Sequence, residues 1–551
     1  MRITHAKRLT VIAGGALAAA ITIGASAAAP RFFDDDPVWR EPDTEDASGM
    51  QPLEVDLLVD LTMNLFNRGA AEPVRAQNVN TVDQVPDSSW FTNRAGFLPL
   101  TAEDVFKGPD TGTGPAPGEW TVTSSKSDGV TPGFTIRDAN GQIWFLKFDP
   151  PGFPGMATGT EVTVTKLIWA LGYHVPENHI AYMRREQLAI GENARFTLPG
   201  GKRRPMRLDD LDTLLKRADR EPDGSYRVVA SGALPGRPIG RIRFVGTRPD
   251  DPNDIVAHQH RRDLRGYGVF AAWLNHVDAK AINSLDTLIT ENGRSYVRHH
   301  LIDFGSALGS GGIAPAHYWE GHEYLVEPGG ILTQMAGFGF LFAKWQTARF
   351  YEAPSIGRLP ESNARFDPEA WKPRVPNQAF LHSRADDKFW AAQKLMALTN
   401  EHLRAAVRAG DFRDPQSEAF LVRALAERRD AIGRAYLTAI NPIVDPALGR
   451  DDVLTFGNAA VEAEFAPPPH AYRAEWYRFD NATGHSVRLG ESSGPTERLA
   501  APVRLPHGPG AFVRVRVSSV DSFVPSWEEP VELFFQRRDG VWRLVGFERL
   551  P

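Results

Sequence analysis

The chain has 551 residues, too many for one compact hydrophobic core, so we expect two or three domains. Its hydrophobic content of 42% and charged content of 24% are ordinary for a globular protein. A net charge of −6 without any block of Lys or Arg argues against a nucleic-acid partner, and the absence of Cys excludes disulfides, thiol catalysis and Cys-ligated zinc.

The first residues are typical of an export signal. Three basic residues precede an apolar stretch over 9–23, and small residues at 25–27 form a cleavage site. We therefore expect residues 1–27 to be a signal peptide and the protein to be periplasmic or extracellular. The alternative is an uncleaved membrane anchor, because the apolar run approaches the roughly 20 residues that span a bilayer.

Residues 28–117 are rich in Asp, Pro and Gly, and we interpret them as an N-terminal extension that wraps the next domain. Strands follow over 120–124, 134–138 and 143–148, and Asn140-Gly141 between the last two is a strong hairpin signal. Further elements are listed in chain order: a helix around 161–171, a helix over 208–218 and strands over 226–231 and 239–245. Together they define a predicted domain over 118–250.

The next predicted domain, 251–442, is mainly helical. A helix over 262–274 precedes a hairpin that turns at Asn292-Gly293, and long amphipathic patterns cover 387–409 and 417–437. Beyond a Pro-rich boundary, strands are expected over 474–479, 512–517, 531–536 and 542–548. The strand pattern therefore predicts a small antiparallel β-sandwich over residues 443–551.

The strongest chemical motif lies directly after the helix of residues 262–274. His276, Asp278, Lys280 and Asn283 have the order and spacing of a kinase catalytic loop. Phosphoryl transfer needs an acceptor for the hydroxyl proton close to an oxygen ligand for Mg²⁺, and one loop can supply both. Asp278 is the candidate base, Asn283 a candidate metal ligand and Lys280 a contact for the transferred group.

A second acidic residue follows the hairpin. Asp303 begins the sequence Asp303-Phe304-Gly305, directly after an apolar strand end. The intervening hairpin is just long enough to return the chain, so Asp303 is expected beside Asn283. The two oxygens could then share a magnesium ion, which favours one or two carboxylates together with phosphate oxygens.

Two upstream residues are anomalous unless they pair. Lys147 shares one face of its strand with Ile143 and Phe145, where a lone ammonium group is costly. Glu161 lies on the apolar stripe of the following helix. A Lys147–Glu161 ion pair would satisfy both and would orient the lysine toward the α- and β-phosphates of a nucleotide.

The turn between the first two strands, Asp128–Gly133, is expected to lie over the phosphates. Gly129 and Gly133 would let its backbone approach closely. The turn does not match the G-x-G-x-x-G pattern of protein kinases.

These motifs resemble the protein-kinase-like superfamily, over roughly residues 118–440. The style is that of its atypical branch, which includes HipA-type kinases, actin-fragmin kinase and phosphoinositide kinases. The resemblance implies an α+β fold of two lobes around an ATP cleft, with Mg²⁺ and phosphorylation of a hydroxyl. An Ala-Pro-Glu element after Gly305 is absent, so an activation segment of the eukaryotic kind is not expected.

Three functions remain open. The first is an exported, ATP- and Mg²⁺-dependent phosphotransferase that acts on a hydroxyl of a protein, lipid or small molecule. The second is a non-catalytic, nucleotide-binding pseudokinase scaffold whose C-terminal β domain docks an envelope or membrane-surface partner. The third is transfer of a nucleotidyl group on the same scaffold.

Overall fold

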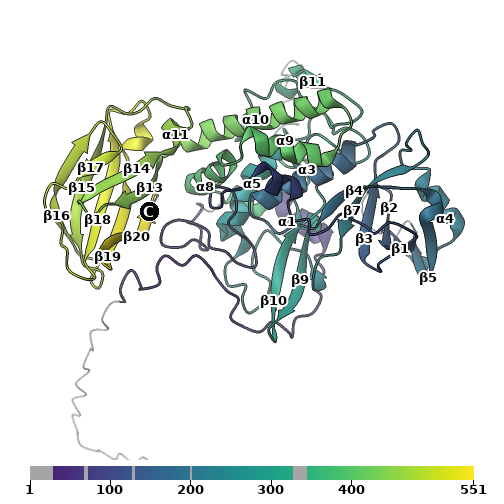
Figure 1. The fold of residues 1–551 in the computed structure, drawn as a ribbon, viewed down its shortest axis with the longest axis horizontal. Coiled ribbons are helices and arrows are strands. Elements are labelled where there is room, and N and C mark those ends of the chain that lie inside the picture. Colours follow the sequence, from purple (N-terminus) through teal and green to yellow (C-terminus); the bar gives the residue numbers. More distant parts are fainter. Residues whose placement is uncertain (1–28, 67–71, 127–130, 199–200, 327–343, 551) are drawn as a thin grey trace, which may run out of the picture.

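The computed structural model of the chain describes residues 29–66, 72–126, 131–198, 201–326 and 344–550. It is a mixed α and β structure with several sheets, and Figure 1 shows the C-terminal strands at one end and the first sheet at the other. The predicted export signal and Gly129 lie outside the described residues. Within those ranges, no helix combines the length and the apolar character needed to cross a membrane.

The first sheet has seven strands in the order β4-β7-β3-β2-β1-β5-β6. They are β1 Trp120–Ser125, β2 Gly133–Arg137, β3 Ile143–Phe148, β4 Asn178–Met183, β5 Leu188–Thr197, β6 Arg203–Pro205 and β7 Tyr226–Gly232. The three strands predicted before residue 149 are confirmed to within one residue at each end. Gly141 in the turn between β2 and β3 has a φ of +79°, which glycine adopts without strain.

Helix α3, Met156–Ala170, contacts both this sheet and helix α9, Asn400–Gly410. It is buried on almost all sides, which explains why it lacks a simple amphipathic pattern. Its N-terminus is capped from a distance, because the Asp149 carboxylate accepts hydrogen bonds from the backbone nitrogens of Ala157 and Thr158, each at 2.9 Å. The charged helix predicted nearby is α4, Leu208–Leu215.

A second sheet, in the order β10-β9-β8, contains β8 Arg237–Gly240, β9 Ser284–Glu291 and β10 Arg294–Leu301. Asn292 and Gly293 have φ values of +52° and +78°, as a tight two-residue hairpin requires. The strand predicted over 239–245 is wrong beyond Gly240. There the chain turns out of the sheet with a φ of +134°, and Gly240 forms an isolated bridge with Leu53.

The helices between residues 251 and 442 build the largest hydrophobic core. They are α5 Arg262–Leu274, α7 Gln378–Leu381, α8 Ala385–Met396, α9 and α10 Pro415–Leu437, with the short strands β11 Phe350–Tyr351 and β12 Leu359–Pro360 between α5 and α7. The amphipathic pattern over 387–409 is divided between α8 and α9. The two helices are separate because a new helix begins after Thr399, whose side chain accepts a hydrogen bond from the backbone nitrogen of His402 and so caps the start of α9.

Two antiparallel sheets follow α10 and share one hydrophobic core, which includes Leu454, Trp476 and Leu533. One contains β13 Ile443–Leu448, β14 Val453–Asn458 and β17 Arg498–Ala500; the other contains β15 Ala471–Phe479, β16 Ser486–Gly494, β18 Phe512–Val520, β19 Val531–Arg538 and β20 Val541–Glu548. The four strands predicted here all form, in the five-stranded sheet. Figure 1 shows α10 leading to these sheets, and the short helix α11, Ala459–Glu462, connects β14 to β15.

The N-terminal segment contacts several of these parts. Phe32 packs among aromatic rings of the five-stranded sheet, and Leu53 and Phe91 form isolated bridges with Gly240 and Tyr173. Its helices are α1 Leu57–Phe66 and α2 Ala102–Lys107. Residues 29–118 therefore connect the C-terminal sheets to the parts of the molecule that hold the candidate site.

Candidate active site

Lys147 lies near the end of β3 and takes part in two ion pairs. Its Nζ is 3.0 Å from Glu161 Oε2 and 3.0 Å from Asp303 Oδ1. The predicted pairing with Glu161 is confirmed. The expectation of an apolar surrounding is wrong, because Phe145 on the same face is exposed, whereas Trp144, Leu146 and Phe148 form the buried face of the strand.

Glu161 is only 1% exposed and binds more than the lysine. Its Oε1 accepts a hydrogen bond from the backbone nitrogen of Phe304 at 3.1 Å, and its Oε2 accepts one from Gly305 at 2.9 Å. Such buried carboxylates are stable only when donors and a cation surround them. Glu161 therefore fixes both Lys147 and the segment that follows Asp303.

Asp303 remains partly open, with 39% of its side chain exposed, and its backbone has a φ of +61°. This left-handed conformation is uncommon outside glycine, although aspartate adopts it more readily than most residues. Burial opposes ionisation of its carboxyl, but Lys147 and then Lys126 more than offset that effect and lower the pKa of Asp303 to about 2. At neutral pH the side chain is a carboxylate, as a ligand of Mg²⁺ must be.

The segment after α5 holds the second group of residues. The helix ends at Asn275, which adopts a left-handed conformation, and the loop then turns into the single helical turn Ala281–Asn283. Asp278 Oδ1 lies 2.7 Å from Lys280 Nζ, and its Oδ2 accepts a hydrogen bond from the Asn283 amide nitrogen at 2.9 Å. Burial acts against ionisation, yet Lys280 and its other partners lower the pKa of Asp278.

The hairpin brings the two groups together. Ser284 pairs with Leu301 across β9 and β10, and the backbone nitrogen of Ile302 donates a hydrogen bond to the carbonyl of Asn283 at 3.0 Å. Asp303 therefore directly follows Ile302, the residue whose backbone contacts Asn283. The predicted juxtaposition of these two chain segments is confirmed.

His276 lies between the two groups, and its ring centroid is 5.6 Å from that of Phe304. Burial lowers the pKa of His276 to about 4, against the opposing influence of Asp278 and Asp303. The imidazole is therefore neutral at physiological pH. Its ring packs against Phe304 beneath the two carboxylates, and both of them act to raise its pKa.

Arg374 is a member of the site that no sequence motif marks. Its Nη1 lies 3.5 Å from Asp278 Oδ1, and its Nη2 lies 2.9 Å from Glu320 Oε2. The backbone nitrogen of Arg374 donates to the carbonyl of Val277 at 2.8 Å, which fastens this distant segment to the loop. Only the three-dimensional structure reveals this contact.

The predicted phosphate turn is described only in part. Gly129 lies outside the described residues, and Gly133 is the first residue of β2, opposite Lys147 in the register. A Cβ at Gly133 would lie 2.3 Å from the carbonyl oxygen of Leu146. The close approach that requires glycine here is therefore to β3.

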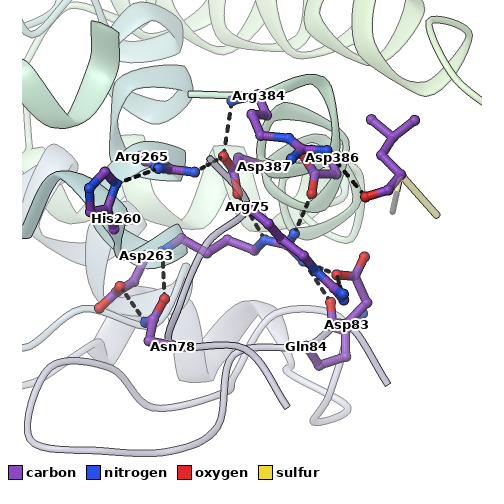
Figure 2. Close-up of polar contacts among 12 residues, drawn as sticks. Arg75, Asn78, Asp83, Gln84, His260, Asp263, Arg265, Arg384, Asp386 and Asp387 are labelled. Carbon is purple, nitrogen blue, oxygen red and sulfur yellow. Dashed lines mark hydrogen bonds and ion pairs between the residues drawn. The ribbon is translucent and has the colours of Figure 1, made fainter. Parts of the chain in front are cut away.

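The N-terminus of α5 is anchored by a buried ionic network, shown in Figure 2. Arg262 contacts Asp83, Asp386 and Asp387 at 2.9, 2.9 and 3.0 Å, and Arg265 contacts Asp387 at 2.9 Å. These pairs join the N-terminal segment and α8 to α5. Since α5 leads directly into the loop of Asp278, the network sets the position of that loop.

The described residues contain no group of three or more His, Asp or Glu side chains that could hold a metal ion by themselves. Magnesium, however, commonly uses one or two protein ligands and completes its coordination with water and phosphate oxygens. Asp303 supplies an ionised, partly open carboxylate. Asn283 turns its amide nitrogen to Asp278, so its amide oxygen is the atom left for a ligand. The two side chains fit a sparse magnesium site.

Known proteins resemble the chain only weakly. No protein-family model and no curated protein matches it. Among solved structures, the Helicobacter pylori proinflammatory kinase CtkA shares 11% identity over 56% of this chain and 93% of its own, with a TM-score of 0.28. The Golgi casein kinase shares 12% identity over 73% of this chain and 96% of its own, with a TM-score of 0.29. Likeness at this level carries no argument about activity.

Proposed function

We propose that the protein is an ATP-dependent phosphotransferase with a protein-kinase-like arrangement of two lobes around the candidate site. The observation that carries the proposal is the position of Lys147 Nζ, 3.0 Å from both Glu161 and Asp303. A lysine held by a helix carboxylate beside an aspartate and a glycine is the arrangement that kinases use to place nucleotide phosphates next to the metal.

In this proposal each group has one role. Lys147 binds the α- and β-phosphates, and Glu161 orients it. Asp278 accepts the proton of the acceptor hydroxyl, and Lys280, whose Nζ lies 2.7 Å from Asp278 Oδ1, stabilises negative charge on the transferred group. The lowered pKa of Asp278 keeps its carboxylate ionised at neutral pH, so an unprotonated oxygen is present to accept the hydroxyl proton, but the same lowering makes the carboxylate a weaker base.

Asp303 and Asn283 would hold Mg²⁺. When bound, the ion would neutralise charge on the phosphate oxygens. Lys147 and Lys126 act on Asp303 in the same direction, because both keep its carboxyl ionised. A cation at Asp303 would have to share the carboxylate with Lys147.

The test is transfer of labelled γ-phosphate from ATP by the purified protein in the presence of Mg²⁺. We expect autophosphorylation or slow hydrolysis, and a loss of at least ~100-fold in Asp303→Ala. The matched control is Asp209→Ala, at an exposed residue in the first turn of α4. Failure of the wild-type protein to bind nucleotide at millimolar ATP would refute the proposal.

A non-catalytic nucleotide-binding scaffold is the alternative, and one observation favours it. Both oxygens of Asp278 are engaged, Oδ1 by Lys280 and Arg374 and Oδ2 by Asn283. An acceptor hydroxyl would have to displace one of these contacts. Thermal stabilisation by ATP without any turnover would select this alternative, with the C-terminal sheets as the part that docks an envelope partner of an exported protein. A labelled product that carries AMP would instead indicate nucleotidyl transfer.

A further inference from the structure

A second cavity, of about 470 Å³, lies where the N-terminal segment, α8 and the C-terminal strands β13 and β20 meet. It shares no lining residue with the candidate active site. Its lining includes the aromatic side chains of Trp39, Phe97, Phe389, Trp390 and Phe547. Its volume is in the range of small-molecule sites, and polar atoms contribute slightly more of its surface than apolar atoms do.

Lys394 is the unusual polar residue of this cavity. It is only 6% exposed, and its Nζ donates a hydrogen bond to the side-chain oxygen of Asn93 at 2.9 Å. The Asn93 amide nitrogen donates in turn to Asp87 Oδ1 at 3.0 Å, so Lys394 is linked to a carboxylate through Asn93 and makes no direct ion pair with a carboxylate of the described residues. Burial lowers the pKa of Lys394 to about 8, although Asp87 acts in the opposite direction. A buried ammonium group without an anionic contact is costly, and a ligand anion would relieve that cost.

A second donor lies on the same helix. Trp390 lines the cavity and is 2% exposed, and its Nε1 has no hydrogen-bond partner among the described residues. Unsatisfied buried N–H groups are rare, because each one costs the desolvation of the donor. Trp390 Nε1 therefore lacks an acceptor, and Lys394, one turn further along α8, lacks a direct anionic contact; one carboxylate could supply both.

The other charged groups of the lining are already paired or lie at the rim. Asp83 and Asp386 each lie 2.9 Å from Arg262, and Arg549 donates to the backbone carbonyls of Asn441 and Ile443. Asp445 is exposed to solvent. The lining thus has acidic groups that are paired or exposed and two cations, Lys394 and Arg549, that make no direct ion pair with a carboxylate of the described residues.

We propose that this cavity binds a small amphiphilic carboxylate. The carboxylate of the ligand contacts Lys394 Nζ and Trp390 Nε1, and its apolar body lies against Trp39 and Phe97, the exposed aromatic rings of the lining. The site is independent of phosphoryl transfer, since none of the residues proposed for nucleotide or metal binding lines the cavity.

The test uses the full-length protein and two probes that differ only in the head group, decanoate and decan-1-ol. By titration calorimetry we expect decanoate to bind at least tenfold more tightly than decanol. Hydrogen–deuterium exchange should show protection by decanoate in peptides that cover 386–394 and 544–549. Equal affinities, an absence of binding, or protection confined to other segments would each refute the proposal.

A pair of lysine variants on α8 provides the second measurement. Lys394→Met should lose at least tenfold in affinity for decanoate and keep its affinity for decanol. Lys388→Met is the control, because Lys388 lies on the same helix and contacts Glu369 at 2.6 Å outside the cavity; it should bind decanoate as the wild type does. Equal losses in the two variants would contradict the assignment. If Lys394→Met does not fold, the comparison of the two probes on the wild type still decides the question.

Discussion

The carboxylate of Glu161 accepts a hydrogen bond from the backbone nitrogen of Phe304 at 3.1 Å, in addition to its ion pair with Lys147. One side chain on α3 therefore orients both the lysine of β3 and the backbone next to Asp303. Helix, strand and loop cannot move independently while these contacts persist. The geometry of the candidate site thus depends on a residue that would touch neither the metal nor the acceptor.

The first prediction concerns Glu161→Gln. The amide has one acceptor oxygen in place of two, so it cannot serve Lys147, Phe304 and Gly305 together, and its NH₂ group would face a donor. We expect a loss of about 2–4 kcal/mol in stability, measured by the first cooperative transition in urea, and a weaker affinity for ATP. Glu103→Gln, at an exposed position of α2, is the control and should change stability by less than about 0.5 kcal/mol. An unchanged transition in Glu161→Gln would show that its hydrogen bonds are not made in solution.

The second prediction concerns the acid side of the stability profile. The pKa of Asp303 is lowered from its ordinary value of 3.8 to about 2, so the folded state binds this proton less readily than the unfolded state does. The resulting stabilisation is present above pH 4 and is lost as the pH falls from about 4 to about 2. Asp303→Asn cannot lose it, because the amide does not titrate.

The difference in unfolding free energy between wild type and Asp303→Asn should therefore be constant from pH 7 to pH 5 and shrink below pH 4. Urea denaturation of both proteins at several pH values measures it. A difference that stays constant down to pH 3 would mean that Lys147 does not stabilise the ionised carboxylate.

The third prediction concerns His276, whose pKa is lowered from 6.5 to about 4 by burial. The unfolded chain takes up this proton at higher pH than the folded protein does, so stability falls as the pH drops from about 6.5 to about 4. At 1.4 kcal/mol per pKa unit, the loss is roughly 3 kcal/mol by pH 4. In His276→Leu this contribution is absent, so the stability of the wild type relative to the variant should decline over that interval.

A direct check is the NMR signal of the His276 ring, which should keep the chemical shift of a neutral imidazole from pH 8 to pH 5. The His276 ring is buried, with its centroid 6.3 Å from that of Tyr267 and 5.6 Å from that of Phe304, and titration of its signal near pH 6.5 would contradict this burial.

Much of the fold could be predicted because its signals are local. The alternation in β3, the Asn140-Gly141 turn and the helical spacing of α5 each lie within a short window, and all three elements form as expected. The Lys147–Glu161 pair was also predictable. Glu161 is the anomaly, because it is a carboxylate buried on its helix, and Lys147 supplies its cation from a face of β3 that is not apolar.

Other features depend on contacts that no local pattern encodes. Arg374 reaches Asp278 because its backbone binds Val277, far away in the chain. Strand β13 was missed because Pro446 suggested a boundary. In the structure the proline is accommodated by an irregularity in the register between Val444 and Ala447, where a missing N–H is tolerated.

The last prediction concerns the buried network beneath α5 and compares two neighbouring carboxylates of α8. Asp387 is fully buried and accepts hydrogen bonds from Arg262 at 3.0 Å and from Arg265 at 2.9 Å. Asp387→Asn therefore removes the negative charge that these two buried guanidinium groups share. Removing one partner of a buried ion pair costs about 3–5 kcal/mol.

Burial, only partly offset by Arg262, raises the pKa of Asp386, which means that its ionised form contributes less to the stability of the folded state. We therefore expect Asp386→Asn to cost less than Asp387→Asn, and Asp209→Asn on exposed α4 to cost little. If the protein has the proposed phosphotransferase activity, Asp387→Asn should lower it in proportion to the fraction of protein that is unfolded. Equal midpoints in urea for the two network variants would contradict this prediction and would show that the contact of Asp387 with a second buried arginine, Arg265, adds no stability.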